Sequence, residues 1–127
     1  MQVDIITPEK ILFSESGVQI VTIPGIEGQM GLLDNHIPIV TFLKPGVINI
    51  ENENKNYYFT TGGVADFKNN SLSILCQEIF NIKELTDQNI NRLKNSANKK
   101  IEDINSSDHE IFISHSIIEE LNLLKFR

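Results

Sequence analysis

The spacing of the apolar residues changes near Glu84, and this change constrains the fold more than any other feature of the chain. Before it, short apolar runs recur about every eight to twelve residues and are separated by Gly, Pro and Asn, which is typical of an antiparallel sandwich or barrel. After it, neither Gly nor Pro occurs, and apolar residues fall three and four positions apart, as on one face of a helix. The sequence therefore predicts an all-β sandwich domain over residues 1–84, followed by a C-terminal α-helical hairpin over residues 85–127.

The apolar runs of the first part predict eight strands. Two connections between them have a recognisable chemistry. Asn69-Asn70 fits a two-residue type I′ hairpin, because Asn tolerates the left-handed backbone that this turn requires. The polar run 51–56 is interpreted as a solvated hairpin loop. The predicted strands span residues 3–6, 18–23, 30–33, 39–43, 47–50, 57–61, 64–68 and 72–75.

Two amphipathic stripes predict the helices of the second part. Thr86 is a suitable N-cap for the first helix. Ser107 and Glu110 have the spacing of a capping box at the start of the second. Isolated helices of this length are marginal in water, so the hairpin must dock on the sandwich, on another protein, or on each in turn. The stripes consist of Ile90, Leu93, Ala97, Ile101 and Ile104, and of Ile113, Ile117, Leu121 and Leu124.

Charge and composition exclude several classes of function. The formal net charge is −6 and no cluster of Lys and Arg is present, which argues against a nucleic-acid partner. No apolar run approaches the roughly 18 residues that cross a bilayer, so we expect a soluble protein without direct membrane insertion. The single Cys76 lies in an apolar run and is interpreted as a small buried hydrophobe.

A catalytic, cofactor-binding or metal site is not predicted. The glycine-containing run 25–31 lacks the Lys and the Ser or Thr of a phosphate-binding loop. His36, His109 and His115 are scattered and have no metal-ligand spacing with Cys76. From the residues alone, His36 is interpreted as a buried histidine bonded to a backbone carbonyl. Two alternatives to an assembly subunit remain: a sandwich hydrolase that uses Asp34 and His36, and a free-standing β-sandwich binding module that dimerises through its helices.

Five motifs follow one another in the first half of the chain. In this order and spacing they resemble the epsilon subunit of F-type ATP synthases, and the resemblance extends over nearly the whole chain. The motifs are IITPE at 5–9, IPGIEGQMGLL at 23–33, HIP at 36–38, LKPG at 43–46 and GGVA at 62–65.

The resemblance implies a sandwich of about ten strands, a two-helix C-terminal domain, and a non-catalytic rotor subunit in the central stalk. It implies that the sandwich binds the gamma subunit and stands on the c-ring, beneath the alpha/beta catalytic head, so that proton transport is coupled to ATP synthesis. It also implies a peripheral location on the cytoplasmic side of a bacterial inner membrane. Where the family often has a carboxylate, this chain has Gln29. The residues matching the family's ring-facing positions are Glu27, Gly28, Gln29, Met30, Gly31 and His36.

The second part departs further from the family. Some bacterial members bind ATP through a motif that includes Asp, Arg and Ala, and this chain has Thr86, Asn89 and Ile90 at the matching positions. The carboxylate and the cation for phosphate are both missing, so we expect no nucleotide cofactor. The predicted last helix is net acidic, whereas the family's inhibitory helix is basic. We therefore expect at most weak inhibition of ATP hydrolysis.

Overall fold

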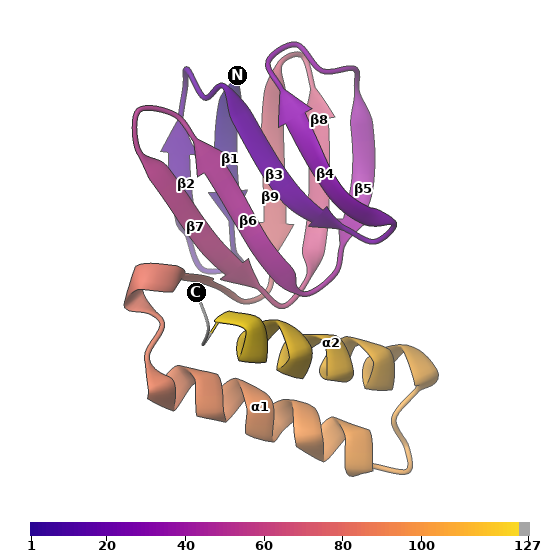
Figure 1. Ribbon diagram of the computed structural model, residues 1–127. Coiled ribbons are helices and arrows are strands. Elements are labelled where there is room, and N and C mark those ends of the chain that lie inside the picture. Colours follow the sequence, from indigo (N-terminus) through magenta and orange to yellow (C-terminus); the bar gives the residue numbers. More distant parts are fainter. Residues whose placement is uncertain (125–127) are drawn as a thin grey trace. The chain divides into compact units, whose positions relative to one another are not determined.

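The computed structural model describes residues 1–124. The chain divides into two compact units, Met1–Ile82 and Lys83–Arg127. The first contains ten β-strands, and the second contains two α-helices (Figure 1).

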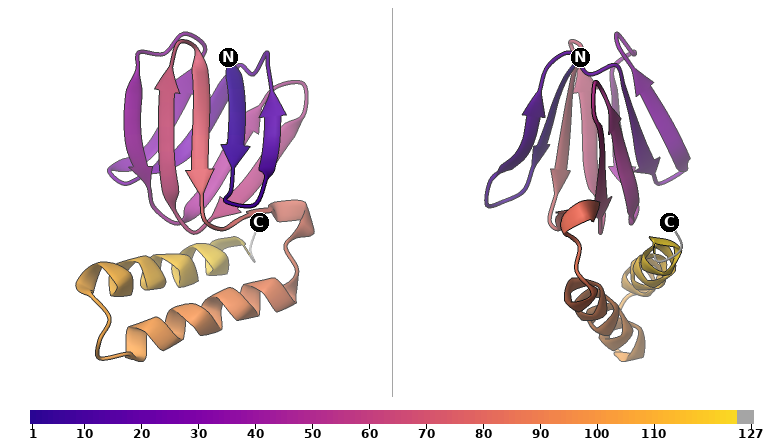
Figure 2. Two further views of the ribbon diagram at one scale, coloured as in Figure 1. Left: turned by 180° about the vertical axis from the view of Figure 1, so that it is seen from behind. Right: turned by 60° about the vertical axis from the view of Figure 1, so that its left-hand side comes forward.

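The strands of the first unit form one ten-stranded sheet that folds back on itself as a half-barrel sandwich. Its order is β10-β7-β6-β3-β5-β8-β9-β1-β2, and β4 leaves this path to pair with β3. The two layers meet at one end of the sandwich and spread apart at the other (Figure 2, right). The strands are β1 Gln2–Ile6, β2 Ile11–Glu15, β3 Ile20–Gly25, β4 Gly28–Leu33, β5 Ile39–Leu43, β6 Gly46–Glu51, β7 Lys55–Thr60, β8 Gly63–Lys68, β9 Ser71–Cys76 and β10 Ile79–Asn81.

The core lies between the two layers and follows the alternation of side chains along each strand. In β1, Val3 and Ile5 are fully buried while their neighbours are half-exposed. β9 repeats the pattern with Leu72 and Ile74, and it pairs with β1 in the one parallel connection among the described strands. Period-two burial of this kind requires that each strand keep its register, because a shift of one residue would turn the apolar set outwards.

The ten strands implied by the family resemblance are confirmed, and the eight predicted from apolar runs all coincide with strands. The apolar pattern missed β2, which buries only Phe13, and β10, which has three half-buried residues. Asn69 and Asn70 have φ angles of 52° and 56°, which confirms the left-handed hairpin turn. The polar loop is shorter than predicted, because β6 and β7 remain paired as far as Glu51 and Lys55.

The second unit is a helical hairpin of α1, Asp87–Glu102, and α2, Asp108–Leu124, preceded by a 3₁₀ turn at Ile82–Glu84. Thr86 caps α1 as predicted, because its hydroxyl accepts the Asn89 N–H at 3.2 Å. The predicted capping box is confirmed. Ser107 Oγ accepts the Glu110 N–H at 3.1 Å, while Glu110 Oε1 accepts the Ser107 N–H at 3.3 Å.

The apolar stripes were predicted correctly in part. In α2 only Leu121 of the predicted stripe is buried, the other three positions are half-buried, and the buried Ser114 was not predicted. α1 buries Ile90, Leu93 and Ala97, but it ends at Glu102, and Ile104 is 96% exposed in the connecting turn. The helix stops because Asp103 adopts an extended backbone and its carboxylate accepts the Asn105 N–H, which favours a turn over another helical residue. The spacing of apolar residues alone could not reveal that a turn at Asp103 is favoured over a further turn of helix.

Gly63 offers a direct test of how closely the strands approach. It pairs with Leu43 of β5 and with Cys76 of β9, and a Cβ on it would overlap the Leu75 carbonyl oxygen and lie 3.0 Å from Cys76 Sγ. We expect Gly63→Ala to lower the free energy of unfolding by about 1–3 kcal/mol, measured by urea denaturation, because backbone atoms must shift. Gly31→Ala is the matched control, since a Cβ there meets nothing within 4 Å. Equal stability of the two variants would contradict this account.

Candidate functional site

The β3–β4 hairpin carries most of the residues predicted to face a partner. The two strands pair along their whole length and are joined by a two-residue turn at Ile26 and Glu27. Gly28 has a φ of 138°, which a side chain would disfavour. A Cβ on Gly25 would lie 2.8 Å from the Gly28 carbonyl oxygen. Glycine on both flanks is therefore required for this tight turn.

The hairpin presents its predicted partner residues in different ways. Glu27 and Gln29 are exposed at the turn and on the outer side of β4, and Gly31 is exposed with open space at its Cβ position. Met30 instead is half-buried and packs against the core of the sandwich. The Met30 side chain therefore supports the hairpin from within, while its neighbours supply the surface.

His36 lies beyond the opposite end of β4 from the turn. Strands rise about 3.3 Å per residue, so this six-residue strand places His36 roughly 20 Å from Glu27. The ring is half-buried, with Nδ1 2.7 Å from the Ile37 carbonyl oxygen and its plane edge-on to Phe67 at 5.8 Å. The predicted bond to a backbone carbonyl is confirmed, but the predicted burial was wrong, because the His36 side chain is only half-buried.

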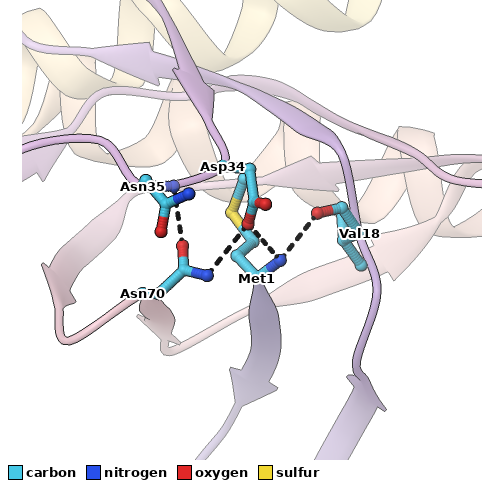
Figure 3. A network of polar contacts seen from close by, with 5 residues as sticks. All are labelled: Met1, Val18, Asp34, Asn35 and Asn70. Carbon is cyan, nitrogen blue, oxygen red and sulfur yellow. Dashed lines mark hydrogen bonds and ion pairs between the residues drawn. The ribbon is translucent and has the colours of Figure 1, made fainter.

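Asp34, two residues before His36 in the loop, belongs to a polar network that joins four segments of the chain (Figure 3). Its Oδ1 lies 2.7 Å from the amino group of Met1 and accepts the Asn70 side-chain amide at 2.9 Å. Asn70 in turn accepts the Asn35 N–H at 2.7 Å, and the Met1 amino group donates to the Val18 carbonyl at 2.9 Å. The hydrogen bond from the Met1 amino group is the largest cause of a lowered pKa for Asp34. These contacts fasten the loop, and they give the hydrolase alternative no support.

A second surface, which the sequence analysis missed, is an apolar row across five neighbouring strands. The cross-strand register places Phe42 opposite Val64, Val64 opposite Leu75, Leu75 opposite Ile6, and Ile6 opposite Ile11. Phe42, Leu75 and Ile11 are 65%, 47% and 63% exposed. We call these five residues the apolar row. It could have been found from the outward positions of each strand, but only after the strand order was known.

Cys76 follows Leu75, the middle member of the apolar row, in β9. The side chain is buried as predicted, at 4% exposure. Burial raises the pKa of the Cys76 thiol, and a hydrogen bond with Thr60 offsets part of this effect. A protonated, covered thiol is a poor nucleophile, which agrees with a packing role.

The three positions matching the family's nucleotide motif have structural tasks at the start of α1. The Thr86 hydroxyl is engaged as the helix cap, Asn89 provides the N–H that it accepts, and Ile90 is 8% exposed. None of these side chains supplies a charge for a nucleotide. Within residues 1–124, no group of three or more His, Cys, Asp or Glu side chains is arranged to hold a metal ion.

The fold and its exposed surfaces define a β-sandwich protein with a C-terminal helical hairpin. None of its described helices has the length and apolar character needed to cross a membrane. Residues 1–82 match the family described as ATP synthase, Delta/Epsilon chain, beta-sandwich domain. The chain belongs to the family of ATP synthase epsilon chains, which confirms the resemblance seen in the five motifs.

Individual relatives agree with this assignment. The chain is 36% identical over 124 residues to the ATP synthase epsilon chain of Pelagibacter ubique (strain HTCC1062), covering 97% of this chain and 95% of the relative. It is 30% identical over 122 residues to that of Rhizobium rhizogenes (strain K84 / ATCC BAA-868), covering 94% and 90%.

Solved structures show the same fold. A chain of the Euglena gracilis mitochondrial ATP synthase (OSCP/F1/c-ring) superposes with a TM-score of 0.73 at 21% identity, covering 98% of this chain and 78% of that one. A chain of the Tetrahymena thermophila mitochondrial ATP synthase central stalk and c-ring gives 0.66 at 20% identity, covering 99% and 94%.

The Asp34 network predicts a specific pH dependence. Because the folded-state pKa of Asp34 is lowered, its stabilising effect is present above the unfolded pKa and is lost as pH falls through the folded pKa. We expect Asp34→Asn to lower the melting temperature at pH 7, and we expect the difference from wild type to shrink as the pH becomes acidic. Thermal melts across pH test this, with Glu53→Gln in the exposed 52–54 loop as the control. A difference that is independent of pH would argue against the charge of Asp34 as its cause.

Proposed function

We propose that this chain is a non-catalytic central-stalk subunit of an F-type ATP synthase, which binds the gamma subunit and the c-ring and couples proton transport to ATP synthesis. The apolar row is the observation that carries the proposal, because an exposed apolar strip across five strands suits a protein partner. Relatives over nearly the full length are epsilon chains. The structural neighbours come from assemblies described as containing a c-ring.

The gamma subunit is the proposed partner of the apolar row. With strands about 4.8 Å apart, a row across five strands is roughly 19 Å long. The neighbouring row on the same face pairs Asp66 with Ser73, and Ser73 with Asp4. This polar row borders the apolar row, so we expect the apolar strip of the partner to end there.

The c-ring is the proposed partner of the β3–β4 hairpin and of His36. A tight turn held by two glycines is stiff, and a contact that transmits torque loses little entropy when its surface is already ordered. Gln29 offers hydrogen bonds where a carboxylate would offer an ion pair, while Glu27 remains as an exposed charge. Since Glu27 and His36 lie at opposite ends of β4, the proposed contact runs along the strand. The subunit would then be peripheral, on the cytoplasmic side of a bacterial inner membrane.

Co-purification tests the proposal. We expect the tagged chain to bring down gamma together with the alpha and beta subunits from membranes of its own cells, and the double variant Phe42→Ser, Leu75→Ser to lose most of that yield. Val40→Ser is the matched control, because Val40 is 67% exposed on the same face of β5 but lies one row away. Circular dichroism should show all three proteins folded. Failure of wild type to bring down gamma would refute the function. Equal loss with Val40→Ser would refute only the assignment to the row.

For the helical hairpin we propose no nucleotide binding and a weak effect on ATP hydrolysis. α2 carries Asp108, Glu110, Glu119 and Glu120, and its last turn has no basic residue within the described range. The basic Lys125 and Arg127 lie outside the described residues. Acidic side chains on the helix would be repelled by an acidic target, so this helix would inhibit only weakly a catalytic subunit that has an acidic contact segment.

Truncation of the helical hairpin tests whether it inhibits ATP hydrolysis only weakly. We expect removal of residues 107–127 from the subunit in the assembled enzyme to change the rate of ATP hydrolysis by less than about twofold, a small change in barrier. The matched control is an enzyme assembled with a subunit that carries Glu119→Lys and Glu120→Lys, which brings the net charge of α2 from −4 to zero and should slow hydrolysis. A large activation on truncation would show that the native hairpin is an effective inhibitor.

A further inference from the structure

β4 is an edge strand with one side unpaired. It pairs with β3 and with no other described strand (Figure 1). The Pro24 carbonyl accepts the Lys44 N–H at 2.9 Å, so the backbone groups of Pro24 point away from β4. Gln29 lies opposite Pro24, and its backbone groups must therefore point to the free side. By the alternation of an antiparallel ladder, the same holds for Gly31 and for the N–H of Leu33, whose carbonyl already accepts the His36 N–H at 3.0 Å.

The β4 edge lacks the usual protection against pairing. Edge strands are commonly guarded by charged residues, proline, bulges or short length. β2 has a bulge and ends in Glu15, and β10 is three residues long. β4, by contrast, spans six residues with the sequence GQMGLL, which contains neither a charge nor proline. Leu33 is 59% exposed on its outer side.

The register of β4 is complementary to itself. An antiparallel pairing with a second copy about Gly31 sets Gln29 against Leu33 of the second copy, Gly31 against its own equivalent, and Leu33 against Gln29 of the second copy. The Gly31 pair can exchange two hydrogen bonds, and each Leu33 N–H can donate to the Gln29 carbonyl of the other copy, while the Leu33 carbonyl keeps its bond from the His36 N–H. Closed two-fold contacts of this kind are the commonest in homo-oligomers.

Charge supports the same register. The chain has a net charge of −6, so most faces of two copies repel each other. Continuing the register beyond β4 brings Glu27 beside Asn35 and His36 of the second copy, and the two-fold axis repeats this contact. Glu27 then meets an amide and an imidazole. The neighbouring Asp34 of the second copy is already paired with its own Met1 amino group at 2.7 Å, and the strand itself brings no charge to the interface.

We propose that the free edge of β4 joins two copies of this chain into an antiparallel, two-fold dimer centred on Gly31. One added strand buries far less than the roughly 1,200 Å² of a stable complex, so the dimer is weak and reversible. It covers Glu27 and Gln29, which the proposed function assigns to the ring. Unassembled copies therefore exchange between monomer and dimer, and assembly into the enzyme competes with the dimer for the same strand.

Sedimentation equilibrium of the full chain over a range of concentrations tests the dimer. Wild type and Gly31→Ala should associate equally, because Ala keeps the N–H and a Cβ at this position meets nothing within 4 Å. Gly31→Pro removes only an N–H that faces the free side, and it should weaken association at least about tenfold. Wild type that stays monomeric at every concentration would overturn the proposal.

Two variants that introduce a charge at Gly31 test the dimer even if the proline variant fails to fold. Gly31→Lys and Gly31→Glu each place like charges at the two-fold axis, so each alone should be monomeric, and a mixture of the two should associate. Failure of the mixture to associate would overturn the dimer. If wild type is monomeric but Gly31→Pro loses co-purification with the other subunits, then the free edge of β4 binds a segment of another protein and does not bind a second copy of this chain. Failure of the dimer leaves the proposed function untouched, because the co-purification of wild type measures that independently.

Discussion

The sandwich depends on the close approach of strands at the corner where β3 pairs with β5. β3 and β5 pair only between Gly25 and Leu43, and this single contact connects the two halves of the sheet. A Cβ on Gly46 would lie 2.8 Å from the Pro24 ring, and one on Gly63 would overlap the Leu75 carbonyl. Gly25, Gly46 and Gly63 all have ordinary φ angles, so their backbone conformation does not require glycine. Glycine is required at these positions because a side chain would collide with the neighbouring strand. The fold closes because these residues lack side chains.

That closure also determines where the two candidate surfaces lie. β5 carries Phe42 one residue before Leu43, so the strand that closes the sheet contributes the first member of the apolar row. β3 turns into β4 directly after Gly25, so the partner hairpin begins at the same corner. The Ile26 N–H donates to the Phe42 carbonyl at 3.0 Å, which ties the hairpin turn to the row. A partner bound at the row and a partner bound at the hairpin would therefore contact neighbouring parts of one rigid scaffold.

The sequence allowed the fold to be predicted where local chemistry decides the outcome. Asn69-Asn70, Thr86 and the Ser107–Glu110 pair each satisfy a backbone requirement within a few residues, and all three predictions were correct. Ile104 shows the limit, because the periodic pattern continues past the point where Asp103 ends the helix. Short strands such as β10 bury too little for a pattern to appear.

The candidate surfaces were harder to predict because they depend on strand order. The members of the apolar row come from positions between 6 and 75, and only pairing across five strands brings them together. The family resemblance identified Glu27, Gln29 and His36, but it could not show that a whole strand separates the first from the last. The same resemblance also drew attention to Gly31 without revealing that its backbone faces an open edge.

The two uses proposed for β4 exclude each other, and this exclusion has a physical consequence. A surface that is stiff and pre-ordered for a permanent partner has the same properties that favour accidental pairing of an edge strand. Charge on β4 would protect the edge but would also add a desolvation cost to a close contact with another subunit. A weak, self-complementary pairing avoids both costs, because it covers the edge while the chain is free and gives way to any partner that binds more tightly. On this proposal, the absence of a charge between Gly28 and Leu33 follows from the contact proposed for the strand after assembly.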